Sequence, residues 1–192
     1  MKPIAVLLAS FLVILSCGGA RADALDDART FFYRGEYQAA LNLLMPLAKQ
    51  GNAEAQAKVG EMYYYRLGVF PDCDKAQDWL RRAANQRHAG AARLMGHVYD
   101  DGRCVNKNNV QAYMWYSVAE TMVPKPARPM GPDDYDAISY PLPIKRKNKD
   151  EEANQGLREL IETDRKIVGE VMTMDQIAEA KQLAKNWKPE TE

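Results

Sequence analysis

The sequence contains few of the residues from which catalytic and metal sites are usually built. Histidine occurs only twice among the 192 residues, at His88 and His97, and neither belongs to an H-x-x-x-H or H-E pattern. No phosphate-binding glycine loop, G-x-S-x-G motif or catalytic cysteine pattern occurs. His97 with Asp100 and Asp101 is the nearest approach to an acid–base cluster, but Asp-Asp-Gly is ordinary at a helix end. We therefore predict a protein that is not an enzyme and holds no metal or cofactor.

A clear excess of one charge is also missing. The chain has 26 Lys and Arg against 26 Asp and Glu, and without its first 22 residues it keeps 24 basic and 26 acidic residues. A nucleic-acid-binding surface needs a clustered basic excess. The basic run KRKNK at 145–149 is followed directly by DEE, which indicates a solvated charge run. Nucleic acid is therefore not an expected partner.

No hydrophobic run is long enough to cross a bilayer. The run IAVLLASFLVIL has about 12 residues, against the roughly 20 that a transmembrane helix needs. Lys2 precedes it and the triplet ARA follows, a pattern typical of a secretory signal peptide over residues 1–22. ILSC, ending at Cys17, also resembles a weak lipobox. We expect an exported, periplasmic protein, with a lipoprotein anchored through Cys17 as the alternative; membrane contact is expected only in the second case.

Cysteine is scarce, and its number limits its chemistry. Two of the three cysteines, Cys73 and Cys104, follow the predicted signal peptide. Two fall short of the four ligands of a structural zinc site, and they lack the C-x-x-C spacing of a redox pair. An even pair in an oxidising compartment favours a disulfide between Cys73 and Cys104, and two buried thiols are the alternative.

An internal repeat with a period of 36 residues organises the middle of the chain. When residues 53–84 are aligned with 89–120, eight of the 32 pairs are identical, against about one in sixteen expected by chance. The identical pairs are Ala53/Ala89, Ala55/Ala91, Gly60/Gly96, Tyr63/Tyr99, Val69/Val105, Ala76/Ala112, Trp79/Trp115 and Ala83/Ala119. The sequence therefore contains at least two copies of one structural unit.

Each copy is predicted to be a pair of helices. The matched residues recur three or four positions apart, so each set lies on one helical stripe. Glycine, proline and asparagine then separate the predicted helices, which cover 53–66, 73–86, 89–101 and 108–121. The predicted repeat core comprises Ala55, Gly60, Tyr63, Ala76, Trp79, Ala83, Ala91, Gly96, Tyr99, Ala112, Trp115 and Ala119. In the aromatic stretch after Val110, we expect Tyr116 to pack and Tyr113 to face outward.

Flanking segments are predicted to close the two ends of this array. Residues 28–49 indicate a degenerate first unit with Pro46 inside its second helix. After residue 150, one helix is expected to have an apolar side, and Thr173 with Gln176 predicts a capping box for a last helix over 174–186. The apolar side of the first of these helices is formed by Leu157, Leu160, Ile161, Ile167 and Val168.

The segment AEAQAKVGEMYYYRLGVFPDCDKAQDWLRRAANQ closely resembles the Sel-one-like repeat, a relative of the tetratricopeptide repeat. The second copy keeps most of the pattern but has Cys104 where the second glycine of the turn usually stands. The resemblance implies an all-α fold, a short right-handed α-solenoid of about three units with a C-terminal capping helix pair. It also implies a concave face that binds another protein, and secreted bacterial members are similar to scaffolds and adaptors of the cell envelope.

Four segments are expected along the chain. They are a signal peptide at 1–22, the repeat solenoid at 23–122, a Pro-rich insertion at 123–150 and the capping helices at 151–192. The insertion holds six of the ten prolines within residues 123–152. It is interpreted either as a surface insertion or as a segment that packs on the solenoid and helps to bind a partner.

The partner-binding residues are expected beside the buried stripe of the first helices. The candidates are Glu61, Tyr64, Tyr65, His97 and Asp100. The main hypothesis is a non-enzymatic scaffold that binds a protein or peptide there. The alternative is an envelope protein that binds peptidoglycan or another carbohydrate, or a divergent hydrolase, in which Tyr64, Tyr65 and Tyr113 stack on sugar rings.

Overall fold

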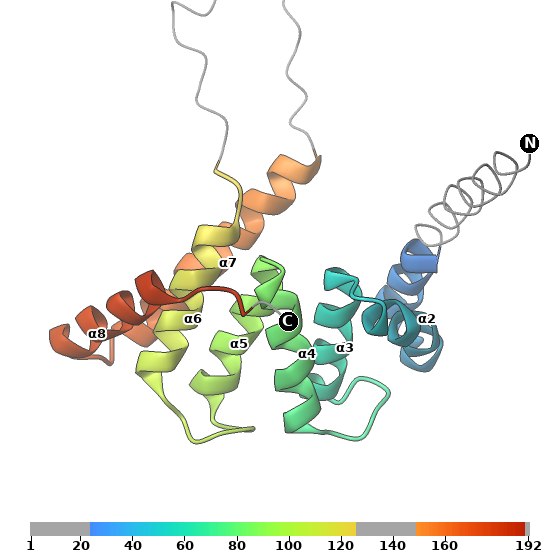
Figure 1. Cartoon of the computed structure of the whole chain (residues 1–192), viewed down its shortest axis with the longest axis horizontal. Helices are drawn as coiled ribbons and strands as arrows, with labels where there is room; N and C mark the ends of the chain where they lie inside the picture. Colours follow the sequence, from blue (N-terminus) through green and yellow to red (C-terminus); the bar gives the residue numbers. More distant parts are fainter. Residues whose placement is uncertain (1–23, 126–148, 191–192) are drawn as a thin grey trace, which may run out of the picture.

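The computed structural model describes residues 24–125 and 149–190, and the described parts contain helices and no strands (Figure 1). After a helical segment at 24–33, the helices are α2 (Tyr37–Lys49), α3 (Ala53–Tyr65), α4 (Cys73–Asn85), α5 (Ala89–Asp101), α6 (Asn109–Met122), α7 (Lys149–Gly169) and α8 (Met174–Asn186). The predicted signal peptide and residues 126–148 of the predicted insertion lie outside the described residues. None of the described helices is long and apolar enough to cross a membrane.

Two helix pairs form the centre of the array. The pairs α3–α4 and α5–α6 stand side by side, with α2 at one end and α7 and α8 at the other (Figure 1). Each of these four helices begins and ends within one residue of its predicted bounds. The prediction of an all-α helical solenoid is confirmed.

Helices α3 to α6 and α8 start where side chains accept the free N–H groups of the first turn. Asn52, Asp72, His88 and Asn108 each accept a hydrogen bond from the backbone N–H three residues later, at 2.9 to 3.1 Å. Thr173 and Gln176 form the predicted capping box at the start of α8. These local interactions explain why the helix starts are readable from the sequence.

Glycines let the two helices of each pair approach closely. A Cβ added at Gly60 would lie 2.7 Å from Cγ of Leu80, and one added at Gly96 would lie 2.3 Å from Cε1 of Tyr116. Leu80 and Tyr116 are fully buried and occupy equivalent places in the two repeats. Each glycine therefore leaves room for a large side chain of the second helix.

The predicted repeat core is buried except for three aromatic residues. Tyr63, Trp79 and Tyr99 are only half-buried, and the space beside Gly60 and Gly96 is filled by Leu80 and Tyr116. Trp79 packs outward against the neighbouring α2–α3 core, and Trp115 packs edge to face on Trp187 at 5.9 Å. The buried members are Ala55, Gly60, Ala76, Ala83, Ala91, Gly96, Ala112, Trp115 and Ala119.

The C-terminal helices pack on the last repeat in different ways. Helix α7 lies against α6 and touches α5, whereas α8 packs on α6 (Figure 1). Ile161 and Val168 of α7 are buried there. Leu160 and Ile167 are exposed, so the apolar side predicted for this helix is wider than the face that α6 covers.

Candidate functional site

The first helices of the two matched repeats present a row of polar and aromatic side chains on one surface. We call this the first-helix surface and define it by Lys58, Glu61 and Tyr65 of α3 and Arg93, His97 and Asp100 of α5. It contains four of the five predicted partner-binding residues. The structure therefore brings four of the five candidates together, although Glu61 and Asp100 are 39 residues apart in the sequence.

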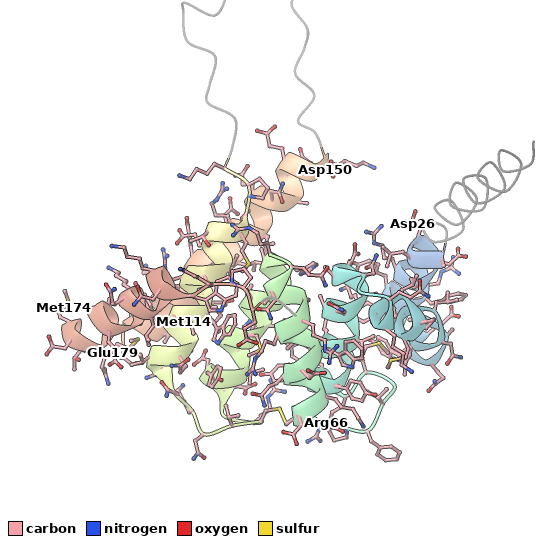
Figure 2. All side chains as sticks on the ribbon, viewed as in Figure 1. Asp26, Arg66, Met114, Asp150, Met174 and Glu179 are labelled. Atoms are coloured by element: carbon pink, nitrogen blue, oxygen red, sulfur yellow. A yellow bond between two sulfur atoms is a disulfide. The ribbon has the colours of Figure 1, made fainter. Side chains whose placement is uncertain are left out.

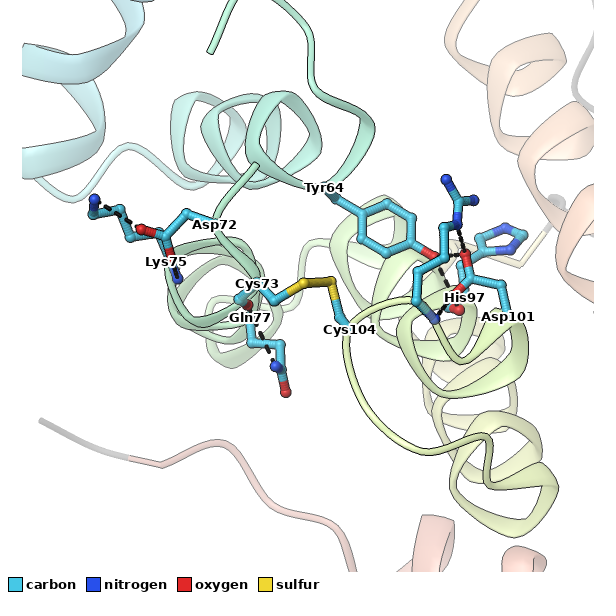
Figure 3. Close-up of a disulfide and its surroundings, with 9 residues drawn as sticks. Tyr64, Asp72, Cys73, Lys75, Gln77, His97, Asp101 and Cys104 are labelled. Atoms are coloured by element: carbon cyan, nitrogen blue, oxygen red, sulfur yellow. Dashed lines mark hydrogen bonds and ion pairs between the residues drawn. A yellow bond between two sulfur atoms is a disulfide. The ribbon is translucent and has the colours of Figure 1, made fainter. Parts of the chain in front are cut away.

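The fifth candidate, Tyr64, is not on this surface, and its predicted exposure is wrong. Its side chain is 4% exposed and points from α3 toward α5 (Figure 3). The hydroxyl donates a hydrogen bond to the carboxylate of Asp101 and lies 3.1 Å from the carbonyl oxygen of His97. Burial and the hydrogen bond to Asp101 raise the pKa of Tyr64. Tyr64 therefore joins the two repeats and is not available to a partner.

Tyr65 is the aromatic side chain that the first-helix surface exposes. It is 38% exposed, and its ring meets Tyr64 edge to face at 4.8 Å. The Arg103 guanidinium lies 5.8 Å from the Tyr65 ring centre and 5.1 Å from that of Tyr64. Burial raises the pKa of the Tyr65 hydroxyl. Tyr65 is thus held between the buried ring of Tyr64 and the exposed guanidinium of Arg103.

Asp101 anchors this aromatic pair electrostatically. Its carboxylate accepts hydrogen bonds from the Arg103 Nε at 2.5 Å and from the Arg103 backbone N–H at 2.9 Å. Burial opposes ionisation of Asp101, but the hydrogen bond from Tyr64 and the contacts with Arg103 outweigh it and lower the pKa of Asp101. The ionised Asp101 therefore fixes Arg103 over the two rings.

Helix α7 covers the far end of the first-helix surface. The Arg93 Nε donates to Oδ2 of Asp164 at 2.6 Å, and the His97 Nε2 lies 3.4 Å from the same oxygen. The Tyr116 hydroxyl is 3.4 Å from the other His97 ring nitrogen. Burial lowers the pKa of His97, although the Asp164 carboxylate acts in the opposite direction. His97 is therefore engaged by the chain itself.

The other polar candidates keep exposed atoms next to fixed counterions. Glu61 is 2.9 Å from Lys58, and Asp100 is 3.1 Å from Lys107. The Lys58 ammonium also lies 4.3 Å from the ring centre of Phe32. Lys58, Glu61 and Tyr65 recur at three- and four-residue spacing along α3, a signal that would have found Lys58 from the sequence. Arg93 carries the same signal, because it lies four residues before His97 and seven before Asp100 on α5. Arg103 and Asp164 had no such signal, because their roles depend on contacts with other helices.

The predicted disulfide is present. Cys73, at the start of α4, is bonded to Cys104 in the α5–α6 connection, with 5.2 Å between their Cα atoms (Figure 3). The alternative of two separate thiols is therefore wrong. Among residues 24–125 and 149–190, no group of three or more His, Cys, Asp or Glu side chains is placed to hold a metal ion.

Tyr113 does not extend the exposed aromatic surface, and the prediction that it faces outward is wrong. Its half-buried ring packs near Gly169 of α7, and the Arg165 guanidinium lies 5.9 Å from its centre. With Tyr64 buried and Tyr113 against α7, the three tyrosines predicted to stack on sugar rings do not form one platform.

Comparisons with known proteins agree with this architecture. Residues 53–88 and 89–120 match the Sel1 repeat. The ERAD-associated E3 ubiquitin-protein ligase component HRD3A of Arabidopsis thaliana is 34% identical over 70 residues, which are 36% of this chain and 10% of that protein. The chain thus spans about a tenth of the length of this relative.

A solved structure shares the fold over most of the chain. It is the crystal structure of a protective antigen present in uropathogenic Escherichia coli strains, which displays an SLR fold. The TM-score is 0.64 at 20% sequence identity, over 88% of this chain and 30% of the antigen chain. Sel1 repeats are in general protein–protein interaction modules, and proteins of the family are typically non-catalytic scaffolds. Residues 53–120 are therefore two Sel1 repeats, and they lie within a helical solenoid that has the SLR fold.

Proposed function

We propose that this protein is a non-enzymatic scaffold that binds a segment of another protein on the first-helix surface. One observation carries the proposal: Tyr65, an exposed aromatic residue packed on the buried ring of Tyr64, lies on the same surface as charged side chains fixed in ion pairs. Fixed side chains lose little conformational entropy when a partner binds. Tyrosine and arginine are also the residue types that most often dominate binding energy at interfaces.

The charges of this surface indicate the chemistry of the partner. Lys58 and Glu61 form one pair beside Tyr65, and Asp100 and Lys107 form another on the next repeat. Both signs therefore recur along the surface, and no large field of one sign is available for a highly charged partner. The best fit is a polypeptide segment with side chains of both signs around an apolar or aromatic residue.

Exchange of single surface residues tests the proposal. Tyr65→Ala and Glu61→Lys are expected to weaken capture of the bound protein at least about tenfold, as loss of an interface hot spot does. Asp78→Lys is the matched control, because it also disrupts an exposed ion pair, that with Arg82 on α4 at 3.1 Å. Capture is measured by crosslinking the native protein and quantifying the attached chain. Equal capture by Tyr65→Ala and the unaltered protein would contradict the proposal.

The same scaffold is proposed to act in the cell envelope of a bacterium after export. The Cys73–Cys104 disulfide supports this proposal, because such bonds persist in oxidising compartments. Mass spectrometry of the mature N-terminus separates the two forms of export. Cleavage after Ala22 gives a free periplasmic protein, and a lipid-modified Cys17 gives an anchored one.

A further inference from the structure

A second surface, on α7 at the C-terminal end of the array, exposes a stripe of large apolar side chains. Leu160 and Ile167 of α7 are 51% and 57% exposed, and beyond its end Val171 in the following turn and Met174 at the start of α8 are 68% and 80% exposed. Met174 lies at the end of the molecule remote from Asp26 (Figure 2). Scattered exposed apolar residues are common, but large ones that recur on one side of a helix and continue past its end are typical of an interaction surface.

The stripe is open because α7 lacks the helix partner that the other first helices have. Helix α3 packs along α4, and α5 packs along α6. In the C-terminal pair, α8 packs on α6 instead of along α7. The covered side of α7 carries Ile161 and Val168, which leaves the adjoining side uncovered among the described residues.

Small residues alternate with the large ones along the stripe. Ala153, Gly156 and Thr163 share this side with Leu160 and Ile167, at alternating spacings of three and four residues. A Cβ added at Gly156 would meet nothing within 4 Å. Such a seam admits the side chains of another helix between its own.

We propose that the occupant of this stripe is α7 of a second copy of the chain, in antiparallel orientation. A two-fold axis close to residues 161 and 162 places Leu160 opposite Thr163 of the second copy. It also places Ile167 opposite Gly156 of the second copy, so that each large side chain meets a small one.

The flanking charges match under the same symmetry. Glu159 and Lys166 are exposed on one flank of the stripe, seven residues apart. The two-fold axis brings Glu159 of each copy beside Lys166 of the other. Within its own chain Glu159 accepts a hydrogen bond from Gln155 at 2.9 Å, and Lys166 has no ion pair with the described residues. Both charges are thus available for pairing between copies.

The size of the contact sets the expected affinity. Helix α7 has 21 residues and is therefore about 30 Å long. One helix pair of this length buries less than about 1,200 Å², which is the range of weak interfaces. The chain is expected to dimerise reversibly, with the dimer fraction rising with concentration.

Sedimentation velocity of the full chain over a concentration series tests the proposal. Glu159→Lys and Lys166→Glu each create two like-charge contacts and are expected to raise the Kd of the dimer about tenfold. The double exchange E159K/K166E recreates opposite charges and is expected to restore the original Kd. Ile167→Asp is expected to abolish the dimer.

Matched controls separate dimerisation through α7 from loss of folding and from association through the N-terminal residues. Glu162→Lys reverses an exposed charge on the side of α7 away from the stripe and should leave the Kd unchanged. All variants keep the same N-terminal residues and must keep the melting temperature of the dilute protein. A chain that stays monomeric at every concentration overturns the proposal. So does a dimer that survives Ile167→Asp, or a double exchange that fails to restore what the single exchanges weaken.

Discussion

Replacing Gly96 with alanine tests the close packing of α5 against α6. The new Cβ would lie 2.3, 2.5 and 2.8 Å from three ring carbons of Tyr116, whereas carbon atoms pack at about 3.5 to 4.0 Å. Tyr116 is fully buried and cannot swing into solvent. An overlap of this size costs about 3 kcal/mol, the upper part of the usual range for overpacked cores.

The helix propensity of alanine offsets part of this cost. Alanine is favoured over glycine inside a helix by about 1 kcal/mol, so Gly96→Ala is expected to lower the free energy of unfolding by about 2 kcal/mol. The melting temperature should then fall by about 4 to 8 °C. Thermal and urea unfolding of the dilute protein, each followed by circular dichroism, measure both quantities.

Two further variants show whether the overlap is the cause. Gly156→Ala lies on α7 with open space around the added Cβ, and it should stabilise the chain by up to about 1 kcal/mol. In a Tyr116→Ala background the overlap no longer exists, so Gly96→Ala should cease to destabilise. A Gly96→Ala protein as stable as the unaltered one would refute the reasoning.

Three other perturbations have defined outcomes. Replacing Cys73 and Cys104 with serine removes a disulfide between positions 31 residues apart and should lower the free energy of unfolding by about 3 to 4 kcal/mol, measured by urea denaturation. Adding reductant to the unaltered protein should cause the same loss, which checks that the disulfide is the cause. Tyr64→Phe removes the hydrogen bond to Asp101 and should cost about 1 to 2 kcal/mol in the same assay; no loss would show that this bond does not join the repeats. Burial lowers the pKa of His88 below its ordinary 6.5, so stability should be full above pH 6.5 and decline as the pH falls toward the folded-state pKa. His88→Asn keeps a cap acceptor and should flatten this decline in pH-dependent melting, and an unchanged slope would contradict it.

The fold was largely predictable because its determinants are local. The starts of α3 to α6 are each fixed by a cap residue three positions before its target, and the repeat of 36 residues places the turns at equivalent positions. Gly60 and Gly96 were predictable as repeat core because they occupy the same place in both copies, but that pattern did not show that Leu80 and Tyr116 pack against them. Short-range patterns of this kind are present in the sequence itself.

The candidate surface was less predictable because burial there depends on neighbouring repeats. Helical periodicity placed Tyr64 beside the core stripe of α3, but α5 covers that side of the helix. The contact between Arg93 and Asp164 joins positions 71 residues apart. Periodicity also placed Leu160 and Ile167 on the apolar side of α7. It could not show that they stay exposed among the described helices. Stacking geometry decides these cases.

The bond between Cys73 and Cys104 also affects how the array opens. In a linear array each unit is stabilised by its neighbours, so unfolding normally starts at any weak junction and spreads. This bond crosses the junction between the two matched repeats, close to the hydrogen bond from Tyr64 to Asp101 (Figure 3). Fluctuations at that junction are therefore suppressed. Amide hydrogen exchange should be slowest in α3 to α6 and fastest at the outer helices, so that the oxidised chain frays from its ends inward.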